Sequence, residues 1–236
     1  MIVAELEVYH SRPIAPTRRL ALGERNLPID PPPGAGGLLL AGIVAHAAPG
    51  VEGELREGLV DLIFELQAGR RIAQPRVRHR FQTDRVGLLR STHRLVAVGQ
   101  ALDFEFDDEL GKPVQQALGA VYAAASLPFE ARRRVLESIQ LGLVWGGDVD
   151  QRFISAVMGG RAPSLLALAA WNDPVAWALE VLGMEGDSSD PPNRRAIQRR
   201  FRQMLREAHP DHGGGSEAAA QRISDLAEAR RILLAS

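Results

Sequence analysis

The residues best suited to specific chemistry in this chain are His209, Pro210 and Asp211, which directly follow an arginine-rich segment. Proline disfavours helix at the residue before it, so we predict that a helix ends here and that His209 and Asp211 point outward from a tight turn. An imidazole and a carboxylate in that position can form directional hydrogen bonds. The preceding segment carries four arginines at spacings of four, three and four, which places them on one helix face: Arg195, Arg199, Arg202 and Arg206. The pattern predicts a positively charged binding surface.

No other group of residues has the spacing of a catalytic, cofactor or metal site. The chain has no cysteine, which excludes disulfides, thiolate metal sites and cysteine nucleophiles. Four histidines are scattered, and no spacing pairs them: His10, His46, His79 and His93. The Gly34–Gly37 segment lacks the Gly-Lys-Ser/Thr of a phosphate-binding loop, so a packing role fits it better. The acids between Asp103 and Glu109 are more typical of the wet face and end of a strand than of a cation site. We therefore predict no catalytic residue, no cofactor and no metal.

Three helices are predicted to position the tripeptide. The first begins at Pro174, with Asp173 as its N-cap, and ends at Gly183. The second opens at residues 190–192, and its apolar stripe lies opposite the arginines: Ile197, Phe201, Met204, Leu205 and Ala208. The third contains a repeat at spacings of three, four and three: Ile223, Leu226, Arg230 and Leu233. A polar, glycine-rich turn between the second and third helices predicts an antiparallel hairpin.

Residues 172–236 resemble the J-domain of the DnaJ co-chaperone family. The stretch 179–184 (LEVLGM) is similar to the first-helix signature of the family, with Leu179 where an aromatic usually stands. Residues 197–205 resemble its basic second helix, and residues 223–233 (ISDLAEARRIL) resemble its third. His209-Pro210-Asp211 is the defining tripeptide of the family. The tripeptide alone would recur by chance, but its place after a basic amphipathic helix and between two matching helices makes the resemblance specific.

The resemblance implies a mechanism that depends on a DnaK-type chaperone. J-domains place their basic helix on an acidic surface of that chaperone and their tripeptide near the junction of its nucleotide domain and linker. Docking stimulates ATP hydrolysis by the chaperone and traps a client. The implied roles are that His209, Pro210 and Asp211 are essential and that the four arginines set affinity and its salt dependence. We expect no fourth helix, Gly/Phe-rich linker or zinc domain, so the chain resembles the third, variable class of the family.

The first 160 residues resemble no known family and predict an α+β domain. Alternating or extended patterns indicate strands at 2–9, 18–22, 75–82 and 93–106. Helical spacing indicates helices at 38–47, 53–68, after Pro113 and after Pro128, and a last one through Val157 with Asp148 as its cap. We therefore predict an α+β domain at 1–160, a boundary segment at 161–171, and an all-α J-domain at 172–236.

Composition fits a cytoplasmic globular protein. The 236 residues are 45% hydrophobic and 24% charged, and the net charge is −1, so no overall field attracts nucleic acid or an anionic membrane. The longest apolar run, 36–48, is shorter than the roughly 20 residues that a membrane span needs. The first seven residues lack the basic region of a secretory signal. The predicted partners are a DnaK-type chaperone and an unknown client, with no nucleic acid and no membrane span.

The sequence thus predicts a co-chaperone that is not itself an enzyme, with residues 1–160 choosing the client or the location. One alternative is an adaptor whose J-like domain binds without stimulating hydrolysis. Another is an enzyme within residues 1–160 with an accessory J-domain. A deep pocket with convergent polar groups and perturbed pKa values would favour the enzyme.

Overall fold

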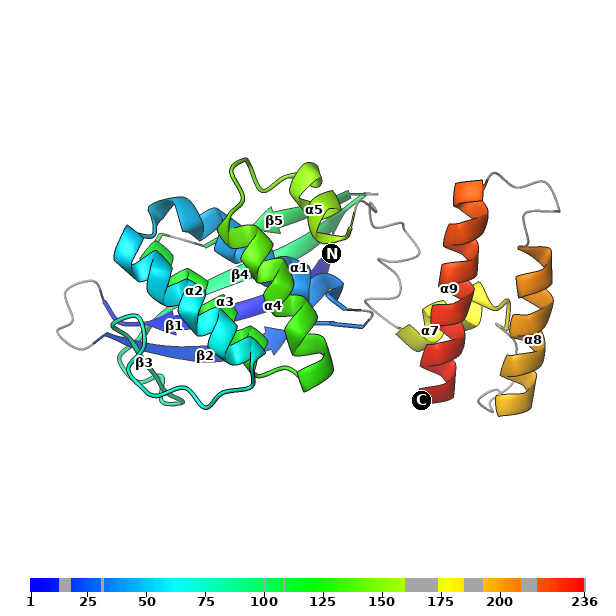
Figure 1. Ribbon diagram of the computed structural model, residues 1–236, viewed down its shortest axis with the longest axis horizontal. Coiled ribbons are helices and arrows are strands. Elements are labelled where there is room, and N and C mark those ends of the chain that lie inside the picture. The colour runs from blue at the N-terminus through cyan, green and yellow to red at the C-terminus, as the bar shows by residue number, and fades with distance from the viewer. Residues whose placement is uncertain are drawn as a thin grey trace. The chain divides into compact units, whose positions relative to one another are not determined.

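The computed structural model describes residues 1–12, 18–30, 32–99, 101–107, 109–159, 174–184, 193–208 and 216–235. The chain divides into two compact units, Met1–Ser164 and Leu165–Ser236, which are considered separately below (Figure 1). The division falls within the segment 161–171 that we predicted as the boundary. Residues 160–173 lie outside the described ones, so the predicted bounds of the two domains stay predictions.

Unit 1 is a mixed α+β structure built on a five-stranded sheet in the order β3-β2-β1-β4-β5. The strands are β1 (Ile2–His10), β2 (Arg19–Asn26), β3 (Arg80–Phe81), β4 (Leu89–Val98) and β5 (Ala101–Glu105). Neighbouring strands are antiparallel except β2 and β3, which are parallel. Side chains of the central strand β1 alternate between the two faces. Leu6, Val8 and His10 are buried under the helices, whereas Glu5 and Glu7 form ion pairs with arginines of β4 on the other face.

Two layers of helices cover one face of this sheet (Figure 1). α1 (Gly34–Ala47) and α3 (Pro113–Ala125) contact the strands, and α2 (Gly53–Gln67) and α4 (Phe129–Leu143) pack on those two helices. Every residue of α1 except His46 is buried, as expected of a helix that is apolar all round. A short turn, η1 (Ala48–Gly50), follows α1, and α5 (Gln151–Val157) packs near β5.

Glycines let α1 and α3 pack closely against the elements on either side of them. A Cβ atom added at Gly142 of α4 would lie 2.4 Å from the carbonyl oxygen of Ala41 in α1, so only glycine permits this helix–helix approach. A Cβ atom at Gly119 of α3 would lie 2.6 Å from the side chain of Val8 in β1. The Gly34–Gly37 segment also serves packing, because all four of its residues are buried at the start of α1.

Some predicted elements of unit 1 are wrong in extent. Only residues 80–81 of the predicted strand 75–82 are a strand, because Val77 and Arg78 adopt positive φ angles of 46° and 58° and turn the chain. The predicted strand 93–106 overlaps two strands, β4 and β5, which turn at Gly99 with φ of 61°. α1 begins at Gly34, four residues before the predicted start.

The cap of α5 is Asp150 rather than the predicted Asp148. The Asp150 carboxylate accepts hydrogen bonds from the backbone N–H groups of Arg152 at 2.8 Å and Phe153 at 3.3 Å. These are two of the donors that a helix start leaves without a partner, which is why this aspartate sets the start of the helix.

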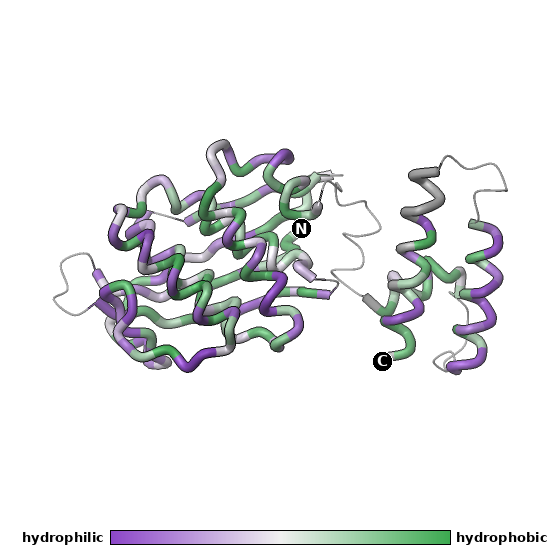
Figure 2. Tube along the Cα trace, in the orientation of Figure 1, coloured by the Kyte–Doolittle hydropathy of each residue, from purple (hydrophilic) through white to green (hydrophobic). Residues whose placement is uncertain are grey.

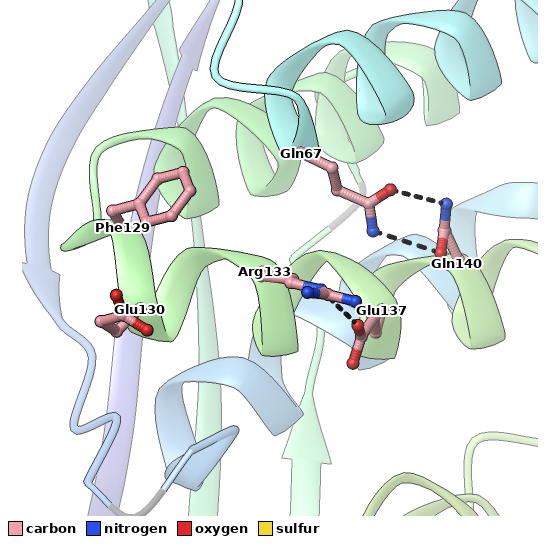
Figure 3. Close-up of a pocket in the computed structure, with 6 residues that line it drawn as sticks. All are labelled: Gln67, Phe129, Glu130, Arg133, Glu137 and Gln140. Carbon is pink, nitrogen blue, oxygen red and sulfur yellow. Dashed lines mark hydrogen bonds and ion pairs between the residues drawn. The ribbon is translucent and has the colours of Figure 1, made fainter.

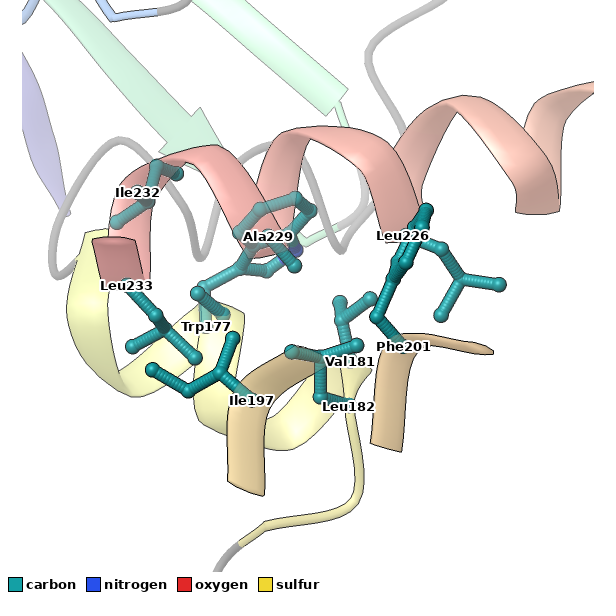
Figure 4. Close-up of a cluster of buried hydrophobic side chains, with 10 residues drawn as sticks. Trp177, Val181, Leu182, Ile197, Phe201, Leu226, Ala229, Ile232 and Leu233 are labelled. Atoms are coloured by element: carbon teal, nitrogen blue, oxygen red, sulfur yellow. The ribbon is translucent and has the colours of Figure 1, made fainter. Parts of the chain in front are cut away.

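Unit 2 contains three described helices, α7 (Pro174–Val181), α8 (Arg194–Glu207) and α9 (Ser216–Ala235). α7 begins at Pro174, as predicted. α8 begins later than predicted, because Asn193 is its N-cap and accepts a hydrogen bond from the backbone N–H of Ala196 at 3.0 Å. The helices share one core cluster (Figure 4): Trp177, Ala178, Val181, Leu182, Ile197, Phe201, Leu226, Ala229, Ile232 and Leu233. The J-domain arrangement of these helices stays a prediction.

Candidate functional site

The four predicted binding arginines lie on the exposed side of α8. Arg195, Arg199, Arg202 and Arg206 are all exposed, and none forms an ion pair with another described residue. Hydrophilic residues run along most of this helix in Figure 2. The structure therefore brings the four together as an uncompensated positive face, hereafter the α8 arginine face.

The opposite side of α8 is fixed to the core of unit 2. Ile197 and Phe201 are 2% and 9% exposed, and they point toward α7 and α9 in Figure 4. The guanidinium of Arg230 in α9 lies over the Phe201 ring, 4.9 Å from its centroid, which is a cation–π contact. Met204, Leu205 and Ala208 of the predicted stripe are only partly buried. Burial of two large side chains on one side leaves α8 little freedom to rotate, so its arginines stay outward.

A fifth arginine has a structural role that the sequence did not reveal. Arg200 donates a hydrogen bond from Nε to the carbonyl oxygen of Leu182 at 2.7 Å, at the C-terminal end of α7. Cations are stabilised near that end of a helix by its unpaired carbonyl groups. The chain then turns at Gly183, with φ of 58°. Arg200 therefore joins α8 to the end of α7.

The tripeptide His209, Pro210 and Asp211 lies outside the described residues, so its predicted role stays a prediction. α8 ends at Glu207, with Ala208 as its C-cap. This end agrees with the prediction that the helix stops just before Pro210. Chain continuity places His209 one residue beyond the last described residue of this segment, directly after the α8 arginine face.

Unit 1 contains a buried polar network that links strands β1 and β4 to helix α3. His10 Nε2 lies 3.0 Å from Ser91 Oγ, and the side-chain amide of Gln116 donates to the same Ser91 oxygen at 3.0 Å. His93 Nε2 lies 3.0 Å from Gln116 Oε1, and the backbone N–H of Asp107 donates to His93 Nδ1 at 3.3 Å. No spacing in the sequence pairs His10 with His93, yet the fold connects them through Ser91 and Gln116.

The hydrogen bonds of this network fix the tautomer of His93. Because His93 Nδ1 accepts from Asp107, the ring proton is on Nε2, which donates to Gln116. The Gln116 amide then donates to Ser91, whose hydroxyl is also hydrogen-bonded to His10 Nε2. The remaining His10 nitrogen, Nδ1, is buried without a partner among the described residues. Both Ser91 and His10 are fully buried, so this serine–histidine pair is closed to a substrate.

A third buried histidine, His79, lies close to the short parallel pair of strands. His79 Nδ1 donates to the carbonyl oxygen of Val77 at 2.8 Å, and its Nε2 is buried without a partner among the described residues. Burial lowers the pKa of His79, and the nearby cations Arg18 and Lys112 lower it further. Burial also lowers the pKa of His10, although the charge of Asp107 opposes this change.

No family model, curated protein or solved structure matches this chain. The resemblance of residues 172–236 to a J-domain therefore rests on the sequence motifs alone.

A surface pocket lies between α2 and α4 (Figure 3). Its lining residues come from these two helices: Gln67, Phe129, Glu130, Arg133, Glu137 and Gln140. The amides of Gln67 and Gln140 donate to each other at 3.3 Å and 3.2 Å, and Arg133 pairs with Glu137 at 3.2 Å. These polar groups form hydrogen bonds and an ion pair with one another rather than converging on an empty centre. The pocket therefore lacks the convergent polar groups that would favour an enzyme.

The described residues hold neither a metal cluster nor a membrane-spanning helix. They contain no group of three or more histidine and acidic side chains that could hold a metal ion. None of the described helices is both long enough and apolar enough to cross a membrane.

Proposed function

We propose that this protein is a co-chaperone that stimulates ATP hydrolysis by a DnaK-type chaperone through unit 2. The observation that carries the proposal is the α8 arginine face, which is exposed, uncompensated among the described residues, and followed in the chain by His209-Pro210-Asp211. A positive face of this kind accelerates encounter with an acidic partner surface. In this proposal His209 and Asp211 bias the chaperone toward its hydrolysing state by binding that state more tightly.

The anchoring of α8 supports this role. A docking helix must present its charges in a fixed register, and here Ile197, Phe201 and Arg200 hold the helix to α7 and α9. Unit 1 would then select the client or the location of the chaperone. It is large enough to do so, since it has a core of its own that includes fully buried side chains such as Leu6, Leu59 and Leu95.

The test is single-turnover ATP hydrolysis by the DnaK-type chaperone of the same cell, with the full chain added. We expect acceleration by the unchanged protein and none by His209→Gln. Three charge removals on α8, Arg195→Gln, Arg199→Gln and Arg202→Gln, should raise the half-maximal concentration about tenfold, since exposed charge pairs contribute roughly 0.2–1 kcal/mol each. That effect should shrink as salt increases.

A matched control removes the same charge from unit 1. Arg133, Arg134 and Arg152 are exposed and paired with acids, so replacing all three by Gln should leave the acceleration unchanged. Acceleration by His209→Gln equal to that of the unchanged protein would contradict the proposal. Binding without acceleration by the unchanged protein would instead support the adaptor.

A further inference from the structure

The positive charge of unit 1 is concentrated in one segment. Residues 70–94 contain eight arginines and one acidic residue, Asp84, in a chain whose net charge is −1. On most of the open sheet face these arginines are neutralised in place, since Arg90 pairs with Glu7 at 3.0 Å and Arg94 with Glu5 at 2.6 Å. The exception is the end of the sheet where β1 finishes and β2 and β3 begin.

Three arginines meet at that end, on the face that the helices leave open. Arg19 and Arg80 are direct partners in the register of β2 and β3, so they lie side by side. Their neighbours Leu20 and Phe81 point the opposite way, and Phe81 stacks on Tyr122 of α3 at 4.2 Å. Arg85 lies over the ring of Tyr9, 5.3 Å from its centroid. Tyr9 itself is opposite Arg90 in the register of β1 and β4. We call Arg19, Arg80 and Arg85 the arginine corner.

The charge of this corner is unfavourable for the isolated protein. Like charges on directly opposed strand residues are destabilising. None of the three arginines forms an ion pair with another described residue, and the one side-chain hydrogen bond of Arg19 goes to the carbonyl oxygen of Val86 at 3.4 Å. Arg80 and Arg85 are exposed. An anionic partner would remove the repulsion that the fold leaves in place.

We propose that the arginine corner binds a single strand of nucleic acid. Guanidinium groups match phosphate oxygens in a planar, bidentate way, and they also stack on bases. A sheet face that the helices leave uncovered suits an extended strand whose bases are unpaired. The corner offers an acidic protein segment little apolar surface to bind. Among its described residues, the large exposed hydrophobic side chain is that of Val86, which is 77% exposed. Protein interfaces are usually anchored by buried aromatic or aliphatic side chains. The inference concerns unit 1 alone and does not depend on the co-chaperone proposal.

The test is fluorescence anisotropy of a labelled oligouridylate of about 12 nucleotides, a length that fits single-strand sites, with the full chain. Three phosphate contacts predict a slope of about −2 for log affinity against log salt, or a loss of roughly 20-fold between about 50 and 200 mM salt. Replacing Arg19, Arg80 and Arg85 by Gln should weaken binding at low salt at least tenfold and bring the slope close to zero. The control triple Arg133→Gln, Arg134→Gln and Arg152→Gln should bind within twofold of the unchanged protein.

Two further measurements test which surface of the protein binds and what kind of partner it binds. Replacement of Arg195, Arg199 and Arg202 by Gln should leave oligouridylate binding unchanged, and loss of binding there would overturn the proposal in favour of the α8 arginine face. Polyglutamate of equal charge should compete poorly, and equal competition would overturn it in favour of an acidic protein. Arg80→Gln relieves the repulsion between Arg80 and Arg19, so the melting temperature of this variant should not fall. An unchanged melting temperature shows that weaker binding does not come from unfolding.

Discussion

Two of the three buried histidines of unit 1, His10 and His79, predict that its stability falls in mild acid. The pKa values of His10 and His79 are lowered by burial, so the folded state binds fewer protons than the unfolded state at pH values just below the ordinary pKa of 6.5. The free energy of unfolding therefore rises with pH in this window. The contribution of the two neutral histidines is fully present above about pH 6.5, and it is lost as the pH falls toward the lowered pKa values. Uptake of two protons on unfolding gives a slope of the free energy of unfolding against pH that approaches about 2.7 kcal/mol per pH unit.

The geometry explains why these rings resist a second proton. His79 Nδ1 already donates to Val77, so protonation would place a new N–H at the buried Nε2, near Arg18 and Lys112. Protonation of His10 would charge a buried ring whose Nε2 is already hydrogen-bonded to Ser91. Both rings are 1% exposed or less, so water cannot offset the charge.

Urea unfolding of the full chain at pH values between about 5.5 and 7.5, spanning the ordinary histidine pKa, is the assay. Trp145 reports on unit 1 because its ring packs edge-on against Phe153 at 5.2 Å, provided that the two tryptophans of unit 2, at positions 171 and 177, are replaced by Phe. His79→Gln should halve the slope. Glu130→Gln, an exposed change on α4, should leave it unaltered. Stability that stays constant, or rises, between pH 7 and 5.5 would refute the reasoning, as would a full slope in His79→Gln.

Two other changes test the packing and the joint between helices. Gly142→Ala should destabilise unit 1 by about 1–3 kcal/mol, because its Cβ would meet the backbone oxygen of Ala41; urea unfolding should show no such loss for Gly53→Ala, where nothing lies within 4 Å. Arg200→Ala should lower the melting temperature of unit 2 through loss of its bond to the Leu182 carbonyl, worth about 1–3 kcal/mol for a charged donor, and Arg199→Ala, which forms no described ion pair, should not.

The sequence predicted most helices because their signals are local. Pro174 at the first position of α7, Pro128 before α4 and the apolar spacing of α2 each act within a few residues. The same reasoning failed at 75–82, where alternation looked like a strand. There the chain turns at Val77 and Arg78, and the segment is held by distant contacts, such as the ion pair of Arg76 with Glu65 in α2 at 2.8 Å. The residues of the segment alone do not indicate that Glu65 is the partner of Arg76.

The buried polar network was missed for a different reason. Ser91 and His93 alternate with the outward residues of β4 and so share the inward face with Leu95. A polar residue at an inward strand position signals that a partner must come from elsewhere. That partner is Gln116, one of two adjacent buried glutamines in the mostly apolar α3. Each signal is visible in the sequence, but only the topology shows that the two meet.

A net charge of −1 predicts no nucleic-acid partner, and this stays a prediction, but the total says nothing of how the charges are distributed. A value of −1 describes the whole chain, whereas a ligand responds to charges within a Debye length, about 8–10 Å at moderate salt. Arg19 and Arg80 are strand neighbours, and strands lie about 4.8 Å apart. The acids that balance them in the total, such as Glu130 and Glu137 on α4, belong to the layer of helices behind the sheet. A surface can therefore be strongly positive in a nearly neutral protein, and the salt dependence of oligouridylate binding measures that local charge directly.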